Sequence, residues 1–378
     1  MRALPLLALA LLSPLASAQV LPPTGRAEVV FPSVLGRGGA GVALPTRETA
    51  LFVNPAHAAA TPSGRFHLTL AGASVRAPAR VGEARELVDE GELPPERLVD
   101  FTRGGAEAGA AVIGPSVSFR TGAVGVAAGA FAAGTAQAHA LADGPDAPVV
   151  ASQRADGIGA AALAARIGET GLAIGAAARY VRRYAATAAA PADDADPLAE
   201  FEPVTGTAVA VDIGAVWQAP LRGLTLGAAA YDLGPAAITY SARDPYGLFD
   251  EGPDALAVEL NSADAGPSLR VGAAYRLGAD SSRTGLTFAA DWVSAASVPG
   301  ERSALDGLRL GVEGALGSVL KARAGFQQGR PSVGATLSLA VIDLDYAFYG
   351  AAVADPAGVP DDADRGFHHA LQLRLGLD

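Results

Sequence analysis

The stretch 371-LQLRLGLD-378 decides the fold, because apolar and polar residues alternate along it without a break. Its four leucines share one face of an extended chain, while Gln372, Arg374 and Gly376 share the other. Strict alternation of this kind is typical of a β-strand with one apolar and one polar face. The same pattern recurs in the second half of the chain, over 269–277, 286–292, 308–316 and 342–349.

These strands predict an all-β fold, a transmembrane antiparallel up-and-down barrel with lipid outside and a polar lumen. A soluble β-sandwich also alternates, but its outward face is rich in Lys, Glu and Thr. Here the second face is mostly Gly and Ala with scattered single charges. The pattern therefore favours the barrel over the sandwich.

The composition supports a membrane protein that crosses with strands. Of the 378 residues, 50% are hydrophobic and only 18% are charged, against about a quarter charged in an average protein. Beyond residue 18 no uninterrupted apolar stretch reaches the roughly 18 residues of a transmembrane helix. Because a bilayer otherwise admits only closed barrels, a barrel is expected. The net charge of −11 argues against nucleic acid as a partner.

The N-terminus predicts export. Arg2 precedes an apolar run over 4–12, and Ala16-Ser17-Ala18 forms a small-x-small cleavage pattern before Gln19. We therefore expect a secretory signal peptide over 1–18. The chain has no Cys, which excludes disulfides, thiolate metal sites and lipid attachment at the cleavage site.

The strand count is predicted to be fourteen. The segments that alternate are 66–76, 111–120, 123–134, 152–166, 171–184, 205–218, 223–232, 235–241, 268–277, 284–293, 306–316, 319–328, 332–341, 342–350 and 367–377. We expect 235–241 to continue its neighbour through a kink at Gly234-Pro235, since bacterial barrels favour even numbers. Residues 81–108 are expected to form an insertion after the first strand, with a small helical element at the rim.

The connections are predicted to alternate between tight and long, as in outer-membrane barrels. Tight turns are expected at Gly122, at Gly317-Ser318 and over 328–331, and long loops over 185–204, 241–267, 294–305 and 351–366. The long loops are acidic, and clustered carboxylates can hold Ca²⁺. A solvated loop is the preferred interpretation, because no EF-hand spacing occurs.

Residues 19–62 do not alternate and are expected to form an N-terminal segment apart from the barrel, which occupies 63–378. They contain G-x-G-x-x-G at Gly36, Gly38 and Gly41, but Pro45 interrupts the helix that a dinucleotide site needs, and the following acidic residue is missing. The glycines, including Gly39, are instead expected to allow tight backbone packing in a crowded lumen. A short helix is predicted over 46–53, ended by Asn54-Pro55.

The phrase 36-GRGGAGVA-43 followed by 50-ALFVNPA-56 resembles the N-terminal signature of FadL-type barrels, the long-chain fatty-acid transporters, and of the related PorV/PorQ group. Further matches favour the PorV-like branch, over 211–215, 223–227, 231–235, 311–313, 324–326, 344–348 and the closing strand from 368. The chain departs from the family at Asp232, where Asn is frequent, and ends in Leu377-Asp378 rather than in an aromatic residue.

The resemblance makes the N-terminal segment a lumenal plug in a bacterial outer-membrane barrel. The candidate plug or gating residues are Gly36, Gly38, Gly39, Gly41, Phe52, Asn54 and Pro55. The candidate lumen-facing charges are Asp212, Arg309, Glu313, Arg323, Asp343 and Asp345. Asp343 and Asp345 could do acid–base work, but pairing with lumenal Arg, such as Arg309 or Arg323 with Glu313, is the simpler interpretation.

No enzyme signature is present. The sequence has no H-E-x-x-H metal pattern and no G-x-S-x-G elbow, and His368 and His369 are adjacent on a strand, so they point to opposite faces. We therefore expect a non-enzymatic protein without metal or cofactor.

Two functions are open. The resemblance to the PorV-like group implies a secretion-associated barrel, a partner of type IX-like secretion proteins or of secreted cargo. The alternative is a FadL-like channel for hydrophobic small molecules. Both imply outer-membrane lipid as the surroundings.

Overall fold

The computed structural model describes most of the strands and the N-terminal segment. The described residues are 29, 31–46, 49–60, 66–78, 96, 99, 106–140, 148–191, 204–233, 239–241, 258–259, 267–277, 284–294, 307–317, 319–327, 329–350 and 367–377. The expected signal peptide, most of the acidic loops and nearly all of the expected 81–108 insertion lie outside these residues. Within the expected loops 185–204 and 241–267, residues 185–191 and 258–259 are strand instead. Among the described residues no helix is long and apolar enough to cross a membrane.

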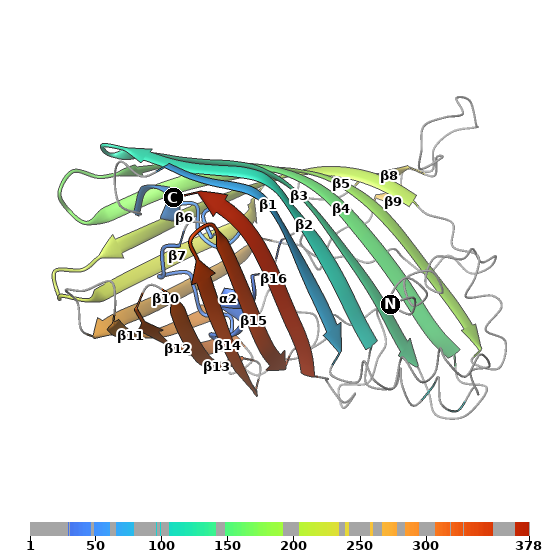
Figure 1. Cartoon of the computed structure of the whole chain (residues 1–378). Helices are drawn as coiled ribbons and strands as arrows, with labels where there is room; N and C mark the ends of the chain where they lie inside the picture. Colours follow the sequence, from blue (N-terminus) through green and yellow to red (C-terminus); the bar gives the residue numbers. More distant parts are fainter. Residues whose placement is uncertain are drawn as a thin grey trace.

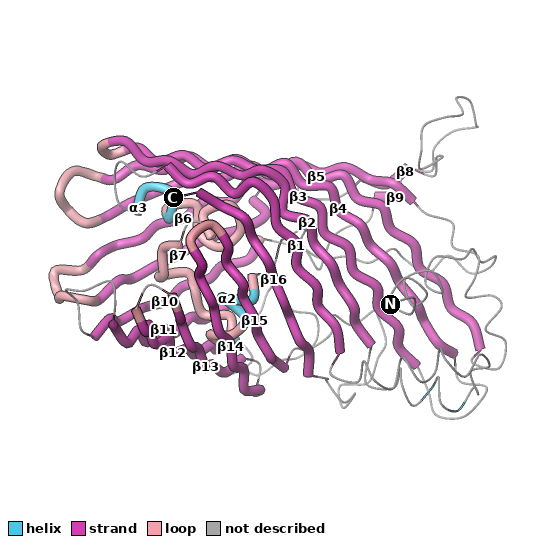
Figure 2. Tube along the Cα trace, viewed as in Figure 1, coloured by secondary structure: helices cyan, strands magenta, loops and turns pink. Residues whose placement is uncertain are grey.

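Fourteen antiparallel strands close into a barrel, as the sequence predicts (Figures 1 and 2). Each pairs with its neighbours in chain order, and the ring closes through pairing of the first strand with the last. The strands are β1 (Phe66–Pro78), β2 (Ala106–Thr121), β3 (Val124–Ala140), β4 (Pro148–Arg166), β5 (Leu172–Pro191), β6 (Val204–Gln218), β7 (Leu224–Leu233), β10 (Ser268–Leu277), β11 (Thr284–Val293), β12 (Leu308–Leu316), β13 (Leu320–Gln327), β14 (Arg330–Leu339), β15 (Ile342–Gly350) and β16 (Phe367–Leu377).

Two short strands extend one wall without adding to the ring. β8 (Thr239–Ser241) pairs with 205–207 of β6, beyond the point where β7 leaves it, and β9 (Val258–Glu259) pairs with β8. β8 therefore continues the line of β7, as predicted for 235–241, although the expected kink at Gly234-Pro235 lies outside the described residues.

The two rims carry different connections. One rim has the tight turns at 122–123, 167–171, 219–223, 317–319 and 340–341, and the other has the long connections after β1, β5, β7, β11 and β15. The turn between β13 and β14 is tight, as predicted, but it does not lie on the rim with the other tight turns, where an arrangement of short turns on one rim would place it. Successive turns must alternate between rims in an antiparallel meander, so this turn lies among the long connections.

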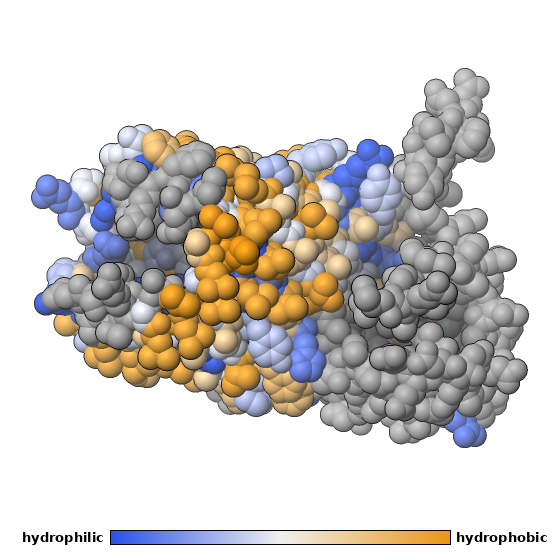
Figure 3. Space-filling model, viewed as in Figure 1, coloured by the Kyte–Doolittle hydropathy of each residue, from blue (hydrophilic) through white to orange (hydrophobic). Residues whose placement is uncertain are grey.

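The apolar face of each strand points outward. Leu371, Leu373 and Leu375 of β16 are 40–49% exposed, whereas Gln372 between them is 0% exposed. Leu269 and Val271 of β10 and the aromatic side chains of β11 are exposed in the same way. Figure 3 shows the resulting apolar surface across the middle of the face in view. A continuous apolar exterior with a polar lumen is the arrangement that a bilayer requires.

The wall is not of even height. β2, β3, β4 and β5 have 16, 17, 19 and 20 residues, whereas β12 and β13 have 9 and 8. Crossing a bilayer takes about 9–11 residues, so β2–β5 project well beyond the rest on the rim with the long connections (Figure 1). This extension also corrects the expected insertion, because 106–108 belong to β2.

The N-terminal segment lies inside the barrel. It contains two short helices, α2 (Pro32–Leu35) and α3 (His57–Ala60), and nearly all of its described residues are buried. The helix predicted over 46–53 is wrong in its described part, where 49–53 form only hydrogen-bonded turns. Val53 N and Asn54 N both donate to the Thr49 carbonyl, and Pro55 has no N–H with which to continue. We call residues 31–60 the plug.

Candidate functional site

The plug backbone packs directly on glycines of the barrel wall. A Cβ on Gly325 would lie 2.2 Å from the Gly38 nitrogen, and one on Gly311 would lie 2.5 Å from the Arg37 carbonyl oxygen. Gly311 and Gly325 are direct cross-strand partners. Among the described residues, eight wall glycines lie this close to the plug. Six of them face plug backbone, namely Gly125, Gly175, Gly227, Gly311, Gly325 and Gly334, and Gly214 and Gly272 face the side chains of Asn54 and Val42. We call them the glycine girdle, and it leaves space for a second backbone inside the wall.

Three of the four plug glycines named from the sequence are tightly enclosed. Gly38 and Gly39 have φ of 64° and 76°, a region that disfavours side chains. A Cβ on Gly38 would lie 2.4 Å from the Leu310 carbonyl oxygen, and one on Gly36 would lie 3.0 Å from the Gly334 Cα. Gly41 has room for a Cβ, with its nearest neighbour 3.6 Å away.

Asn54 holds the plug to itself and to the wall. Its Nδ2 lies 2.9 Å from the Val42 carbonyl oxygen, 3.1 Å from that of Ala215 on β6 and 3.3 Å from that of Ala228 on β7. Its Oδ1 accepts from the Ala56 N–H. Asn54 is completely buried, so these hydrogen bonds replace those that its amide group would make to water. Pro55 follows against Gly175 of β5.

Arg37 is a buried cation of the plug that pairs with the wall. Its Nη1 donates to Glu313 of β12 at 2.7 Å, and Arg323 of β13 donates to the same carboxylate oxygen at 2.6 Å. Burial lowers the pKa of Arg37, against the opposing effect of Glu313. Arg323 also donates to Thr336, which donates to Asp345.

Three further predicted charges, Arg309, Asp343 and Asp345, lie on strands β12 and β15. Arg374 of β16 bonds Asp345 at 2.7 Å and lies 3.5 Å from Asp343, which is half-exposed. Arg309 lies 3.5 Å from Gln327 rather than on Glu313. The two aspartates of β15 therefore share an arginine.

Asp291 of β11 binds the plug backbone. One of its oxygens accepts from the N–H groups of Gly41 at 2.7 Å and Val42 at 2.9 Å. On β14, Ser332 Oγ accepts from the Gly38 N–H at 2.9 Å. These contacts and the Arg37–Glu313 pair are all made on β11, β12 and β14.

Asp212 belongs to a separate buried cluster on β5–β7. Arg179 Nη2 lies 3.0 Å from Asp212 and 2.7 Å from Asp232. Asp232 has φ of 54°, at a bulge where β7 changes register with β6. Because of this bulge, both Tyr231 and Asp232 point into the lumen, and the Tyr231 hydroxyl donates to the Val53 carbonyl of the plug.

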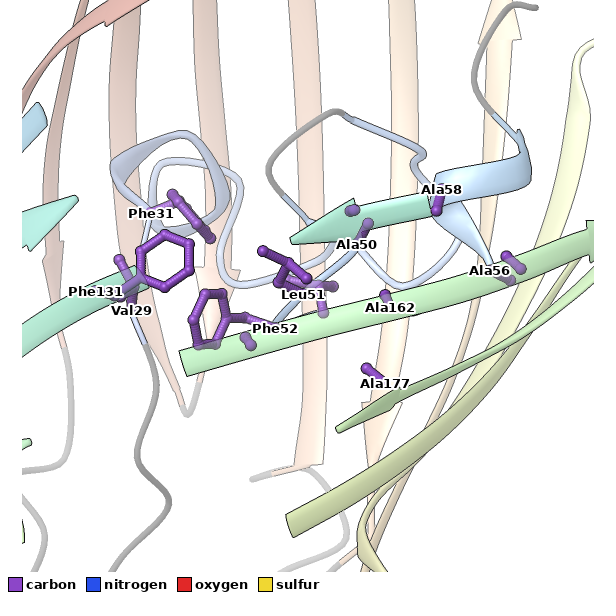
Figure 4. Close-up of a cluster of buried hydrophobic side chains, with 14 of the residues drawn as sticks. Val29, Phe31, Ala50, Leu51, Phe52, Ala56, Ala58, Phe131, Ala162 and Ala177 are labelled. Carbon is purple, nitrogen blue, oxygen red and sulfur yellow. The ribbon is translucent and has the colours of Figure 1, made fainter. Parts of the chain in front are cut away.

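The opposite wall meets the plug through apolar side chains. Phe52 stacks edge-on against Phe131 of β3 with centroids 5.0 Å apart, and lies 6.2 Å from Phe31 of the plug (Figure 4). The cluster also takes in residues from β2–β5, such as Ile113, Ile158, Ala162, Ala177 and Val181. A cavity of about 60 Å³ lies at its edge, lined by apolar Phe31, Leu51, Ile113 and Phe131 and by polar Ser116, Ser118 and Arg374.

His57 lies buried where the plug folds on itself. Its Nε2 donates to the Val42 carbonyl at 3.0 Å, so its Nδ1 accepts from the Thr49 hydroxyl at 2.6 Å. Burial lowers the pKa of His57 to about 4, and Arg37 adds to the shift while the Val42 carbonyl opposes it. The imidazole is neutral at pH 7.

The structure adds residues that the sequence did not single out as site residues: Arg37, His57, Phe131, Arg179, Tyr231 and Asp291. Arg179 and Asp291 carried a signal, since each is a charge on the inward face of an alternating strand. Phe131 and Tyr231 carried no such signal, because their role comes only from their contacts with the plug, at Phe52 and at the Val53 carbonyl. No group of three His, Cys, Asp or Glu that could hold a metal occurs within the described residues. His368 is buried and His369 exposed, as strand geometry predicts.

A comparison with solved structures finds a similar fold in a transporter barrel. The toluene transporter TbuX of Ralstonia pickettii has a TM-score of 0.50 and 14% identity, over 92% of this chain and 97% of that one. The likeness is one of fold. The translocator domain of the autotransporter NalP from Neisseria meningitidis has a TM-score of 0.41 and 10% identity, over 92% of this chain and 99% of that one. The toluene transporter TodX of Pseudomonas putida has a TM-score of 0.39 and 11% identity, over 95% of this chain and 99% of that one.

No protein-family model matches the sequence, and no curated protein matches it. The likeness to TbuX supports the predicted transmembrane barrel at the level of fold.

Proposed function

We propose that this protein is a non-enzymatic outer-membrane channel that admits hydrophobic small molecules, with the plug as its gate. The observation that carries the proposal is the apolar contact between the plug and the wall at Phe31, Phe52 and Phe131. A solute that lacks polar groups can replace such contacts with its own surface, because hydrophobic contact is not directional. A sugar or an ion would leave its hydration shell uncompensated there.

The small cavity beside Phe131 supports the same class of solute. Most ligand sites are lined by apolar side chains with a few polar groups, and this cavity has that composition. Its volume of about 60 Å³ is far below the roughly 300–1,000 Å³ of a ligand pocket. The plug is therefore in its closed position, and a solute passes only when the plug side chains move.

The direct test is uptake by cells that lack other channels for hydrophobic solutes. Cells that make the protein are expected to take up radiolabelled toluene severalfold faster than cells with an empty vector, and labelled glucose at the same rate. Phe52→Ala, which removes the ring between Phe31 and Phe131, is expected to raise toluene uptake further.

Phe288→Ala is the matched control, because Phe288 is on the lipid-facing side of β11, 44% exposed. It is expected to leave uptake unchanged. Equal toluene uptake with and without the protein would refute the proposal, provided that the barrel is shown to be folded in the outer membrane.

A secretion-associated role is the second candidate, and one observation favours it. The walls β2–β5 project beyond the membrane-spanning part of the barrel, which gives a partner or a cargo protein a surface to bind. Co-purification with large secretion proteins, and a defect in cargo release on deletion with toluene uptake unchanged, would select this role.

A further inference from the structure

Apart from the hydrogen bonds that join Asn54 and Val53 to β6 and β7, the plug meets the barrel with two chemically different faces. Toward β11, β12 and β14 it makes an ion pair and backbone hydrogen bonds, through Glu313, Asp291 and Ser332. Toward β2–β5 it presents the apolar cluster of Phe31, Phe52 and their neighbours. We call these the polar wall and the apolar wall.

The polar wall binds the plug by contacts that cannot be exchanged for a hydrophobic solute. Separating Arg37 from Glu313 would leave Arg37, which is 3% exposed, as an unpaired charge in the lumen. Moving Gly41 and Val42 away would leave two N–H groups and the Asp291 carboxylate without partners. Both losses oppose a movement away from this wall.

The apolar wall binds the plug by contacts that a hydrophobic solute can replace. The wall side chains in the cluster that contains Phe52 are aromatic or aliphatic, and many are alanines, among them Ala160, Ala162, Ala164, Ala173 and Ala177. Alanines leave a smooth surface without deep interlocking, so little shape complementarity is lost on separation. The 60 Å³ cavity lies at this seam, where the packing is already incomplete.

We propose that the plug remains bound to the polar wall while hydrophobic solutes pass between its Phe31–Phe52 face and strands β2–β5. The inference rests on the proposed uptake function and specifies where in the lumen the solute travels. It differs from release of the whole plug, which would separate the plug from both walls at once.

Four alanines allow a matched test, because the protein has no native cysteine. Ala162 and Ala177 belong to the apolar wall, and Ala289 and Ala347 contact the plug on the polar side, next to Ala40 and Leu35. All four are at most 7% exposed. Each is replaced singly by Cys, and the rate of labelling by an apolar maleimide is measured in outer membranes.

Labelling at Ala162→Cys and Ala177→Cys is expected to be about tenfold faster than at the other two sites, since labelling follows the population of the opened state. Excess toluene is expected to slow it, and the attached label is expected to reduce toluene uptake. Arg37→Met, which removes the ion pair, is expected to make Ala289→Cys and Ala347→Cys label fast as well.

Similar labelling rates at all four sites in the protein with Arg37 intact would overturn the inference in favour of whole-plug release. Faster labelling on the polar side would overturn it outright. The proposed function fails in a different way, by the absence of toluene uptake in the unmodified protein.

Discussion

The plug can dock because glycines of the barrel wall lack a Cβ at the points of contact. Gly325 and Gly311 face each other across two strands, and the backbone of Arg37 and Gly38 occupies the place where side chains would be. The sequence predicts close packing around Gly36–Gly41, and it also predicts a Gly-rich inner face. It cannot predict that these glycines meet, because the two segments are nearly 300 residues apart and only the closed barrel brings them together.

Gly325→Val is therefore expected to expel the plug without unfolding the barrel. The added Cβ would overlap the Gly38 backbone, which cannot move within a filled lumen. The measurement is single-channel conductance in planar bilayers, which should rise from near zero to that of an open pore. Gly159→Ala is the control, because a Cβ at Gly159 meets nothing within 4 Å. An unchanged conductance in a folded Gly325→Val barrel would contradict the expectation.

His57 makes plug docking depend on pH. Its pKa is about 4 in the docked plug and 6.5 in a free chain, so above pH 6.5 it is neutral in both states and docking is unaffected. Between pH 6.5 and 4 the undocked state takes up a proton that the docked state does not. Docking is then weakened by up to about 3 kcal/mol at pH 4 and below.

Conductance and protease cleavage within 31–60 are accordingly expected to increase as the pH falls from 7 to 4. His57→Asn keeps a polar side chain but does not titrate, and it should flatten this profile. An equally steep profile in His57→Asn would assign the pH effect to other groups.

At the scale of elements, strand positions were predictable and plug structure was not. Period-two alternation locates all fourteen barrel strands, because one face must be apolar in lipid and this constraint acts on every residue. The plug has no solvent or lipid face, so no periodicity marks its turns, and the helix expected over 46–53 is absent from its described part. The strands β2–β5 are also longer than predicted, and the projecting ends of β2, β3 and β5 are rich in Ala and alternate weakly.

The cluster on β5, β6 and β7 is expected to stabilise this part of the wall. Asp212→Asn would weaken the hold on Arg179, which is 1% exposed, and the expected loss in the free energy of unfolding is about 3 kcal/mol. Urea unfolding in lipid vesicles, followed by tryptophan fluorescence, measures it. Asp343→Asn is the matched control at a half-exposed position near Arg374, where a loss below about 1 kcal/mol is expected. Equal losses would show that burial does not decide the effect.

For the whole molecule, the outward apolar face is the feature that requires a bilayer. Leu373 lies near the middle of β16, and Leu339 ends β14 beside a tight turn; both side chains are about half exposed. Leu373→Arg would place a guanidinium in the hydrocarbon, with an expected loss of about 2–4 kcal/mol, whereas Leu339→Arg at the rim should lose about 0–1 kcal/mol.

The readouts are unfolding in vesicles and the change in gel mobility on heating that folded barrels show. Both variants should require detergent for extraction, as the unmodified protein should. A soluble sandwich would tolerate both substitutions equally, because arginine on a water-facing strand costs little. Equal stability of Leu373→Arg and Leu339→Arg, with release into buffer without detergent, would therefore refute the membrane barrel and the channel together.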